Sequence, residues 1–356
     1  MTNKIQKTTE EVPFLWQDRE IRFDISMAQL SLQSGEQIVD SMNDVEDTKG
    51  NNGDRGSLII TNLRLIWFCD KDRHINLSIG YDCVLSNDIR DVQSILKGGS
   101  SQALYLRTKY QSSRYEFVFS CVVAENESRL FQTFQHVIKS YNSTKLYRDL
   151  KLRAAIISEK QLQLLPGEQI YSKYQGVWNL SAEQGNLGQF IITNVRIVWF
   201  AQLTESFNVS LPWLQMKCLR VRESKYGVAL VLETSDFSGS YVLGFRVENV
   251  DKVFEEIASI FKTFRQKPVF GVQCHFEETE TDIAKVTIPR EEDSMRIVET
   301  DYEHVRSIQN TYAVSKKANN GNEEVDDDEI EFNYSLGLAC EKLPKGISID
   351  ALWKIV

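Results

Sequence analysis

The chain has 356 residues, of which 42% are hydrophobic and 26% charged, and its formal net charge is −9. This composition is typical of a globular protein of about two domains, and the acidic balance gives no reason to expect nucleic-acid binding. Residues 1–270 hold 32 basic and 31 acidic side chains, whereas residues 271–356 hold 9 and 19. The acidic excess therefore lies in the C-terminal quarter, whereas the positive and negative charges of residues 1–270 nearly cancel.

The ends of the chain and its cysteines carry no targeting or cross-linking signal. Residues 1–14 lack the apolar core of a secretory signal, so we expect a flexible N-terminus there. No apolar run approaches the ~18 residues that a membrane-spanning helix needs. The six cysteines are scattered without a C-x-x-C pair, which favours buried thiols in a reducing compartment over disulfides or a zinc site.

A repeat organises the body of the chain. Residues 59–68 (IITNLRLIWF) recur 132 positions later as residues 191–200 (IITNVRIVWF), and residues 35–81 share 16 identities in 47 positions with residues 167–213. The match continues at an offset of 126 and ends at an offset of 123. Repeats of this length indicate two copies of one domain rather than a solenoid of short units.

Each copy is predicted to contain about seven short strands followed by one helix. In the first copy the strand-like runs are 38–42, 58–60, 63–68, 75–79, 83–95, 103–108 and 114–119. Helical spacing follows at Leu130, Phe131, Phe134, Val137, Ile138 and Tyr141, and in the second copy at Val253, Phe254, Ile257, Ile260, Phe261 and Phe264. A sheet of that length must curl and close, and the helix can plug one end. We therefore predict an α+β fold of two pleckstrin-homology-like β-barrels, each capped by a C-terminal α-helix.

The pattern Gly-Glu…Gly…Ile-Thr-Asn-x-Arg-x-x-Trp resembles the GRAM and GLUE branch of pleckstrin-homology-like domains. A closer resemblance is to one family whose members carry two such domains in tandem. It rests on the runs 46–56, 147–153, 176–181, 207–210 and 335–339. That resemblance implies a non-catalytic subunit of the BBSome, a coat-like complex that carries membrane proteins into and out of cilia, with the other BBSome subunits as partners. It also implies peripheral binding to phosphoinositide-containing membranes, and a location in the cytoplasm, at the ciliary membrane and at the basal body.

The sequence contains no arrangement typical of a catalytic site. The four histidines, His74, His136, His275 and His304, lie at no ligand or triad spacing, and no hydrolase, zinc-protease or phosphate-loop motif occurs. We therefore expect no enzymatic activity, no metal and no cofactor. Arg64 and Arg196 interrupt apolar strands, and we expect them to face solvent or to pair with a carboxylate, with a ligand role as the alternative. Trp67 and Trp199 are expected in the core.

A phosphoinositide headgroup would need cations from the loops at the open end of a barrel. In the first copy these loops, about 43–55, 69–73 and 108–114, supply the candidate lipid-binding residues Lys49, Arg55, Arg73, Lys109 and Arg114. These loops contain six basic and six acidic side chains in total. The basic residues that lipid-binding pleckstrin-homology domains usually carry on their first two strands are absent. The loops of the second copy, about 176–187, 202–206 and 234–240, contain no Lys or Arg, so we expect no headgroup site there.

A second basic cluster falls between the copies and comprises Lys145, Arg148, Lys151 and Arg153. Three interpretations of this basic linker patch stay open: a solvated face, a patch for an anionic membrane, and a dock for an acidic subunit surface. The acidic stretches 277–282 and 323–331 predict disorder, whereas the apolar residues of 336–356 predict a short docking element.

The predicted organisation runs from a flexible N-terminus (1–14) through the first domain (15–145), a basic linker (146–160), the second domain (161–270) and an acidic disordered linker (271–330) to a C-terminal docking element (331–356). The function that fits is an adaptor that holds a trafficking complex together and presents it to a membrane. The alternative is a freestanding phosphoinositide-binding module that recruits one partner through its tail. A module of that kind would bind headgroups tightly by itself, whereas a subunit would be unstable without its partners.

Overall fold

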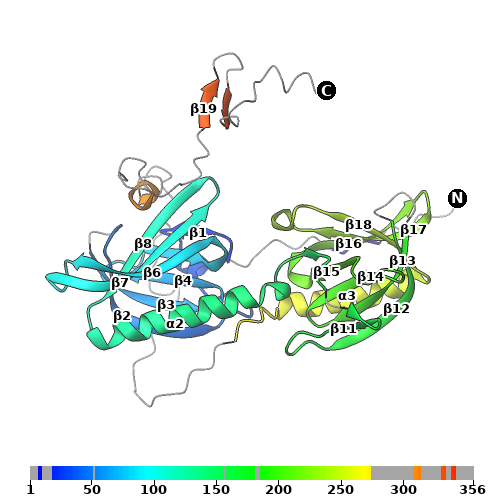
Figure 1. Ribbon diagram of the computed structural model, residues 1–356, viewed down its shortest axis with the longest axis horizontal. Helices are drawn as coiled ribbons and strands as arrows, with labels where there is room; N and C mark the ends of the chain where they lie inside the picture. The colour runs from blue at the N-terminus through cyan, green and yellow to red at the C-terminus, as the bar shows by residue number, and fades with distance from the viewer. Residues whose placement is uncertain are drawn as a thin grey trace. The chain divides into compact units, whose positions relative to one another are not determined.

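The computed structural model describes residues 7–9, 18–50, 53–155, 157–180, 185–273, 308–313, 330–333 and 338–341. The chain divides into two units, residues 1–314 and residues 315–356. In the second unit, β19 (Ile330–Asn333) and β20 (Leu338–Glu341) form an antiparallel hairpin. The first unit contains two curled eight-stranded sheets, each followed by a long helix (Figure 1).

The first barrel is an antiparallel sheet with the strand order β1-β5-β4-β3-β2-β8-β7-β6. Its elements are β1 (Ile21–Phe23), α1 (Met27–Leu30), β2 (Ile38–Asp47), β3 (Arg55–Thr61), β4 (Arg64–Cys69), β5 (Asn76–Gly80), β6 (Val84–Ser94), β7 (Gly99–Tyr110), β8 (Ser113–Cys121) and α2 (Ala124–Ser143). The seven predicted strands and the helix are confirmed, and β1 adds a further strand beside β5. The sheet curls but does not close completely, because β1 and β6 remain its two edges.

The second barrel repeats this order as β16-β17-β18-β12-β13-β14-β15-β9. Its elements are β9 (Lys151–Leu152), β10 (Ile157–Ser158), β11 (Gln161–Leu162), β12 (Ile170–Asn179), β13 (Asn186–Thr193), β14 (Arg196–Ala201), β15 (Asn208–Pro212), β16 (Met216–Ser224), β17 (Gly227–Thr234), β18 (Val242–Arg246) and α3 (Val250–Gln266). Because β9 pairs with β15, part of the expected linker 146–160 belongs to the second sheet.

The helices form as their apolar spacing predicts. All six predicted core positions of α2 are buried, as are Val253, Phe254, Ile257 and Phe261 of α3. These faces pack on the apolar interiors of their own sheets, which hold the fully buried Trp67 and Trp199. The indole nitrogens donate to the carbonyls of Val45 and Val177, at 3.0 and 3.1 Å. The tryptophans therefore pack in the core, as expected.

Strands β3 and β4 are buried on both faces, as are their counterparts in the second barrel. The outward-facing Phe68 packs with Met27 and Leu30 of α1, whereas the corresponding Phe200 packs with Ala155 and Leu162. Continuous apolar runs in these strands reflect this second layer of packing. Gly56 is required at the close approach of β3 to β4, because a Cβ atom there would lie 2.4 Å from the carbonyl oxygen of Phe68.

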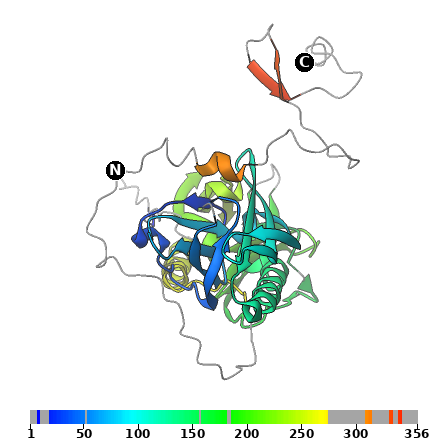
Figure 2. The ribbon, with the colours of Figure 1, turned by 90° about the vertical axis from the view of Figure 1, so that its left-hand side faces the viewer.

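Several predicted segments lie wholly or partly outside the described residues. Of the expected flexible N-terminus only residues 7–9 are described, and of the expected docking element only 331–333 and 338–341. Most of the acidic linker, including 277–282 and 323–329, also lies outside them. Within that linker, however, residues 308–312 form a helical turn that lies against the first barrel (Figure 2).

Candidate binding site

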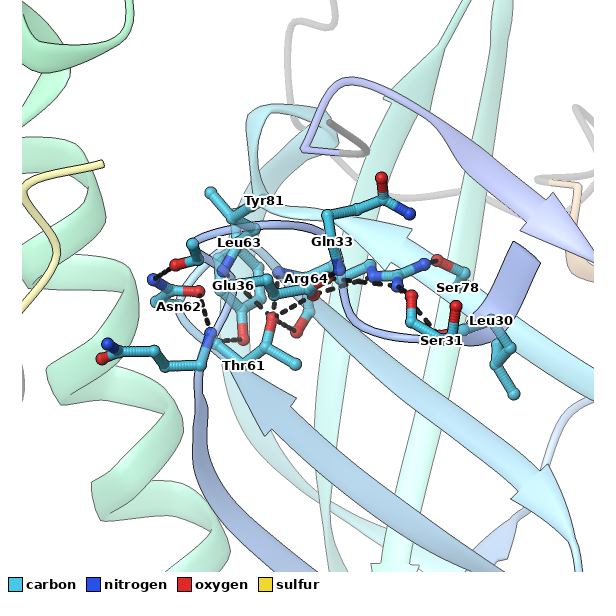
Figure 3. A network of polar contacts seen from close by, with 12 residues as sticks. Leu30, Ser31, Gln33, Glu36, Thr61, Asn62, Leu63, Arg64, Ser78 and Tyr81 are labelled. Atoms are coloured by element: carbon cyan, nitrogen blue, oxygen red, sulfur yellow. Dashed lines mark hydrogen bonds and ion pairs between the residues drawn. The ribbon is translucent and has the colours of Figure 1, made fainter. Parts of the chain in front are cut away.

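The repeated Arg and Glu of the sequence motif form a buried ion pair in each barrel. Arg64 Nε donates to Glu36 at 2.9 Å, and both side chains are completely buried. The remaining guanidinium protons reach Ser78 and the carbonyls of Leu30 and Ser31, at 2.9–3.1 Å (Figure 3). All three guanidinium nitrogens thus have protein acceptors, and the arginine links β4 and β5 to α1 and to the segment that precedes β2, so it is committed to the fold rather than to a ligand.

The second barrel contains the same network at the equivalent positions. Arg196 Nε donates to Glu168 at 2.8 Å and its Nη1 donates to Ser210 at 3.0 Å. The hydroxyl of Thr193 also bonds to Glu168, at 2.9 Å. The expectation of a carboxylate partner is confirmed for both arginines, and the motif Gly-Glu…Ile-Thr-Asn-x-Arg encodes a structural network rather than a ligand site.

Two of the five candidate lipid-binding residues are neutralised by carboxylates of the first barrel. Lys49 Nζ lies 2.6 Å from Glu116, and Arg55 Nε lies 2.9 Å from Asp44. Partial burial would raise the pKa of Glu116, but hydrogen bonds from Lys49 and Tyr105 outweigh it and lower this pKa below its usual value. Glu116 is therefore ionised near neutral pH, and it competes with any anion for Lys49.

The other three candidates lie on exposed surface. Arg73 is in the turn between β4 and β5, and Lys109 and Arg114 face each other across the β7–β8 hairpin. No described carboxylate forms an ion pair with Lys109 or Arg114. Like charges directly opposite each other destabilise a strand pair, so an anion bound between them would relieve that repulsion.

The open end of the first barrel is filled by Tyr312, from the expected disordered tail. Tyr312 is fully buried and belongs to the core of this barrel, and Ile308 packs beside it. Its ring lies 4.8 Å from that of Phe117 and 5.5 Å from that of Phe23, measured between centroids. Ala313 forms a bridge to Tyr115 of β8. The segment 308–313 therefore occupies the space beneath the β2–β3 turn, where a headgroup would have to enter.

The phenol of Tyr312 is anchored by Asp47, the last residue of β2. The hydroxyl donates to the fully buried Asp47 carboxylate, which also accepts from the backbone amides of Lys49 and Gly50. Burial and the adjacent carboxylate raise the pKa of Tyr312, so the phenol stays protonated and donating. Sequence reasoning missed this pair; its only signal was the i, i+4 spacing of Ile308 and Tyr312.

The basic linker patch is not a single exposed surface. Arg148 is almost completely buried and donates to the carbonyls of Phe270 and Tyr141, at 2.8 and 2.5 Å. Lys151 pairs with Asp149 at 3.4 Å, whereas Lys145 and Arg153 are exposed. Arg148 has therefore to be removed from the patch, because its charge is used inside the fold.

The described residues offer little to catalysis. They contain no group of three or more His, Cys, Asp or Glu side chains placed to hold a metal ion. Burial raises the pKa values of Cys83 and Cys121 to about 12, which keeps these thiols protonated and unreactive. No helix within the described part of the chain is long and apolar enough to span a membrane.

Comparison with known proteins agrees with this geometry. Residues 36–143 match the family described as the Bardet-Biedl syndrome 5 protein N-terminal PH-like domain, and residues 151–274 match its second PH-like domain. The chain belongs to the Bardet-Biedl syndrome 5 protein family. The first matched range spans β2 to α2 of the first barrel and the second spans β9 to α3 of the second, so the fold expected from the sequence resemblance is confirmed.

Relatives named "BBSome complex member BBS5" cover nearly the whole chain. The zebrafish protein (Danio rerio) is 45% identical over 96% of this chain and 98% of its own length, and the human protein is 44% identical over the same shares. The nematode relative from Caenorhabditis elegans, named "BBSome complex member bbs-5", is 39% identical over 96% of this chain and 97% of its own length. The likeness therefore extends across both barrels and well into the tail.

Proposed function

We propose that this protein is a non-catalytic subunit of a BBSome, in which it serves as an adaptor for transport of membrane proteins into and out of cilia. The near-full-length relatives are named as members of that complex. Its partners are then the other BBSome subunits, and its location is the cytoplasm, the ciliary membrane as a peripheral protein, and the basal body. The buried ion pairs and protonated thiols support a structural rather than an enzymatic role.

The observation that carries the adaptor role is the state of the two open barrel ends. In the first barrel Lys49 and Arg55 pair with carboxylates, and Tyr312 fills the interior. In the second barrel the three loops expected at the open end, about 176–187, 202–206 and 234–240, hold no Lys or Arg, but do hold Glu205 and Asp236. Without convergent cations a polyphosphorylated headgroup is bound weakly, so we assign the main binding energy to protein partners.

A second candidate function, phosphoinositide binding, is favoured by the exposed pair Lys109 and Arg114. No described carboxylate forms an ion pair with either cation, so the two would add membrane contact to the assembled complex. The alternative of a freestanding lipid-binding module needs the same residues to bind headgroups tightly without partners.

Purification of the tagged chain under native conditions, followed by mass spectrometry, tests the proposal. We expect a stoichiometric set of the other BBSome subunits. A chain recovered alone, stable and bound tightly to phosphoinositide liposomes would favour the freestanding module instead.

A further inference from the structure

The segment that follows α3 leaves the second barrel and packs on the first. Phe270, which is 3% exposed, forms an apolar cluster with Leu63 of the β3–β4 turn and with Leu214 of the turn between β15 and β16. Two residues further along, Val272 belongs to the apolar core of the first barrel. Residues 266–273, here called the connector segment, therefore join the two barrels through buried side chains.

Hydrogen bonds from side chains hold the backbone of the connector segment. At its two ends, the hydroxyl groups of Ser34 and of Ser140 in α2 donate to the carbonyls of residues 266 and 273. In its middle, the buried guanidinium of Arg148 donates to the carbonyl of Phe270 at 2.8 Å. Three backbone acceptors of the segment are thus satisfied from the first barrel and from the linker that follows α2.

The linker between α2 and β9 is buried in the same joint. Tyr147, which is 3% exposed, donates from its hydroxyl to the carbonyl of Pro166 at 2.6 Å. A Cβ atom at Gly271 would lie 2.4 Å from the ring of Tyr147, so the connector segment passes directly over this ring. The side chain of Gln215, in the second barrel, donates to the carbonyl of Arg148 at 2.6 Å.

The close approach of the connector segment to the first barrel depends on Gly35, the glycine of the repeated Gly-Glu motif. A Cβ atom at Gly35 would lie 2.7 Å from the carbonyl oxygen of Pro268 and 3.0 Å from the ring of Phe270. The equivalent Gly167 of the second barrel has nearly the same φ, 77° against 81°, but no described atom lies within 4 Å of a Cβ atom there. The connector segment therefore covers the motif of the first copy alone.

A further connection crosses between the barrels in the opposite direction. Thr8 forms an antiparallel bridge to Arg220 of β16 in the second barrel. Lys7 Nζ lies 2.9 Å from Asp251 and 3.0 Å from Glu255 of α3. The chain then enters β1 of the first barrel. The barrels are thus linked through the N-terminal part of the chain as well as through the linker and the connector segment.

We propose that the connector segment holds the two barrels in one fixed relative orientation, and that the protein presents them to its partners as a single body. Domains joined by exposed linkers move relative to each other, whereas here such motion would expose Phe270 and Leu63 to water and separate Arg148 from its acceptor. A partner that contacts both barrels then avoids the entropic cost of ordering two mobile domains. This second step rests on the proposed function.

Two matched pairs of variants test the connector segment. Phe270→Ala removes the ring at the centre of the joint, and Val269→Ala, at a neighbouring side chain that is 38% exposed, is its control. Gly35→Ala and Gly167→Ala place the same methyl group on nearly the same positive-φ backbone, but only Gly35→Ala pushes against the connector segment. Urea unfolding of each variant checks that both barrels remain folded.

The distance between two spin labels, measured by pulsed electron paramagnetic resonance, reports the relative orientation of the barrels. The labels would be attached to p-acetylphenylalanine in place of the exposed Gln135 of α2 and Ser259 of α3, which leaves the native cysteines unmodified. We expect a narrow distance distribution in the unchanged chain and in both controls. Phe270→Ala and Gly35→Ala should broaden it about 2-fold or more, because the joint loses its buried centre.

Reconstitution with the other BBSome subunits tests the presentation of both barrels together. We expect Phe270→Ala to weaken assembly about 10-fold, and Val269→Ala to stay within about 2-fold of the unchanged chain. Undiminished assembly of a chain whose distance distribution has broadened would overturn this second step. An unchanged chain that does not assemble would overturn the proposed function, while the distances still decide the fixed orientation.

A distance distribution that stays narrow in Phe270→Ala and Gly35→Ala, or one that is already broad in the unchanged chain, would overturn the fixed orientation. If Phe270→Ala does not fold, the comparison of Gly35→Ala with Gly167→Ala decides.

Discussion

Tyr312 donates a hydrogen bond to the carboxylate of Asp47, a residue that precedes it by 265 positions and is likewise fully buried. The pair fastens a single turn of the tail to the end of β2. Because both groups are withdrawn from water, the phenol needs the carboxylate as acceptor, and the carboxylate gains the phenol as a donor beside the amides of Lys49 and Gly50. The same contact places the tail at the loops that were expected to receive a lipid headgroup.

Replacing Tyr312 should release this turn from the first barrel. We expect Tyr312→Phe to weaken the docking of residues 308–313 by about 1–3 kcal/mol, because the Asp47 carboxylate loses a buried donor. Tyr312→Ala should cost about 3–5 kcal/mol, because the ring packed against Phe117 is lost as well. Hydrogen exchange of residues 308–313 measures the effect. The exposed Asn310→Ala is the control, and unchanged protection in Tyr312→Ala would contradict the docking.

The equivalent buried ion pairs of the two barrels allow the same prediction to be tested in each barrel. Arg64→Met should destabilise the first barrel by about 3–5 kcal/mol, because Glu36 is left as an uncompensated buried charge. Combining it with Glu36→Gln should recover part of that loss. Arg196→Met and Glu168→Gln should behave alike in the second barrel. Urea unfolding, followed through hydrogen exchange of each barrel, measures these losses separately. A loss below about 1 kcal/mol, which is typical of an exposed ion pair, would contradict the prediction.

Asp18 should make the first barrel less stable as the pH rises. Burial raises the pKa of this carboxyl to about 7, against the weaker opposing effects of Arg19 and of the hydrogen bond from Tyr141. Since the folded pKa is the higher one, the stabilising contribution is complete below the unfolded pKa of about 4 and is lost as the pH rises through about 7. The difference amounts to about 4 kcal/mol at most.

Unfolding of the unchanged chain and of Asp18→Asn, compared from pH 4 to pH 8, measures this linkage. The asparagine variant should lack the decline, so that the two curves converge toward low pH and separate toward high pH. Asp82→Asn, at an exposed neighbouring carboxylate, should follow the unchanged chain. Parallel curves for Asp18→Asn would show that Asp18 does not titrate in this window.

Liposome flotation of the full chain over a phosphoinositide series tests the lipid site. We expect weak binding that fades with salt, because exposed charges are screened within about 8–10 Å. Lys109→Ala with Arg114→Ala should remove more of it than Lys49→Ala with Arg55→Ala, whose cations already pair with carboxylates. Unchanged binding by the variant with Lys109→Ala and Arg114→Ala would indicate that the lipid contacts Lys145 and Arg153 instead.

The sequence was informative wherever a local pattern specifies a local structure. The period-2 alternation at Ile75, Leu77 and Ile79 predicted β5, and the 3.6-residue spacing from Leu130 to Tyr141 predicted the buried face of α2. The repeat carried these assignments to the second barrel. The absence of Lys and Arg from the three open-end loops of that barrel, about 176–187, 202–206 and 234–240, is likewise a property of the sequence, which folding does not alter.

Only the tertiary structure decided which distant residues meet. Arg64 could face solvent or bind a carboxylate until the curl of the sheet brought Glu36, 28 residues earlier, within 2.9 Å of it. Arg148 belonged by sequence to a basic patch, yet the path of the chain places acceptor carbonyls around it and buries its charge. Tyr312 lies in an acidic stretch whose composition predicts disorder, and Phe23, Asp47 and Phe117 become its site only once β1, β2 and β8 converge. Local patterns fix local conformation because they act over one or two turns of chain, whereas these contacts depend on how the whole sheet closes around a shared interior.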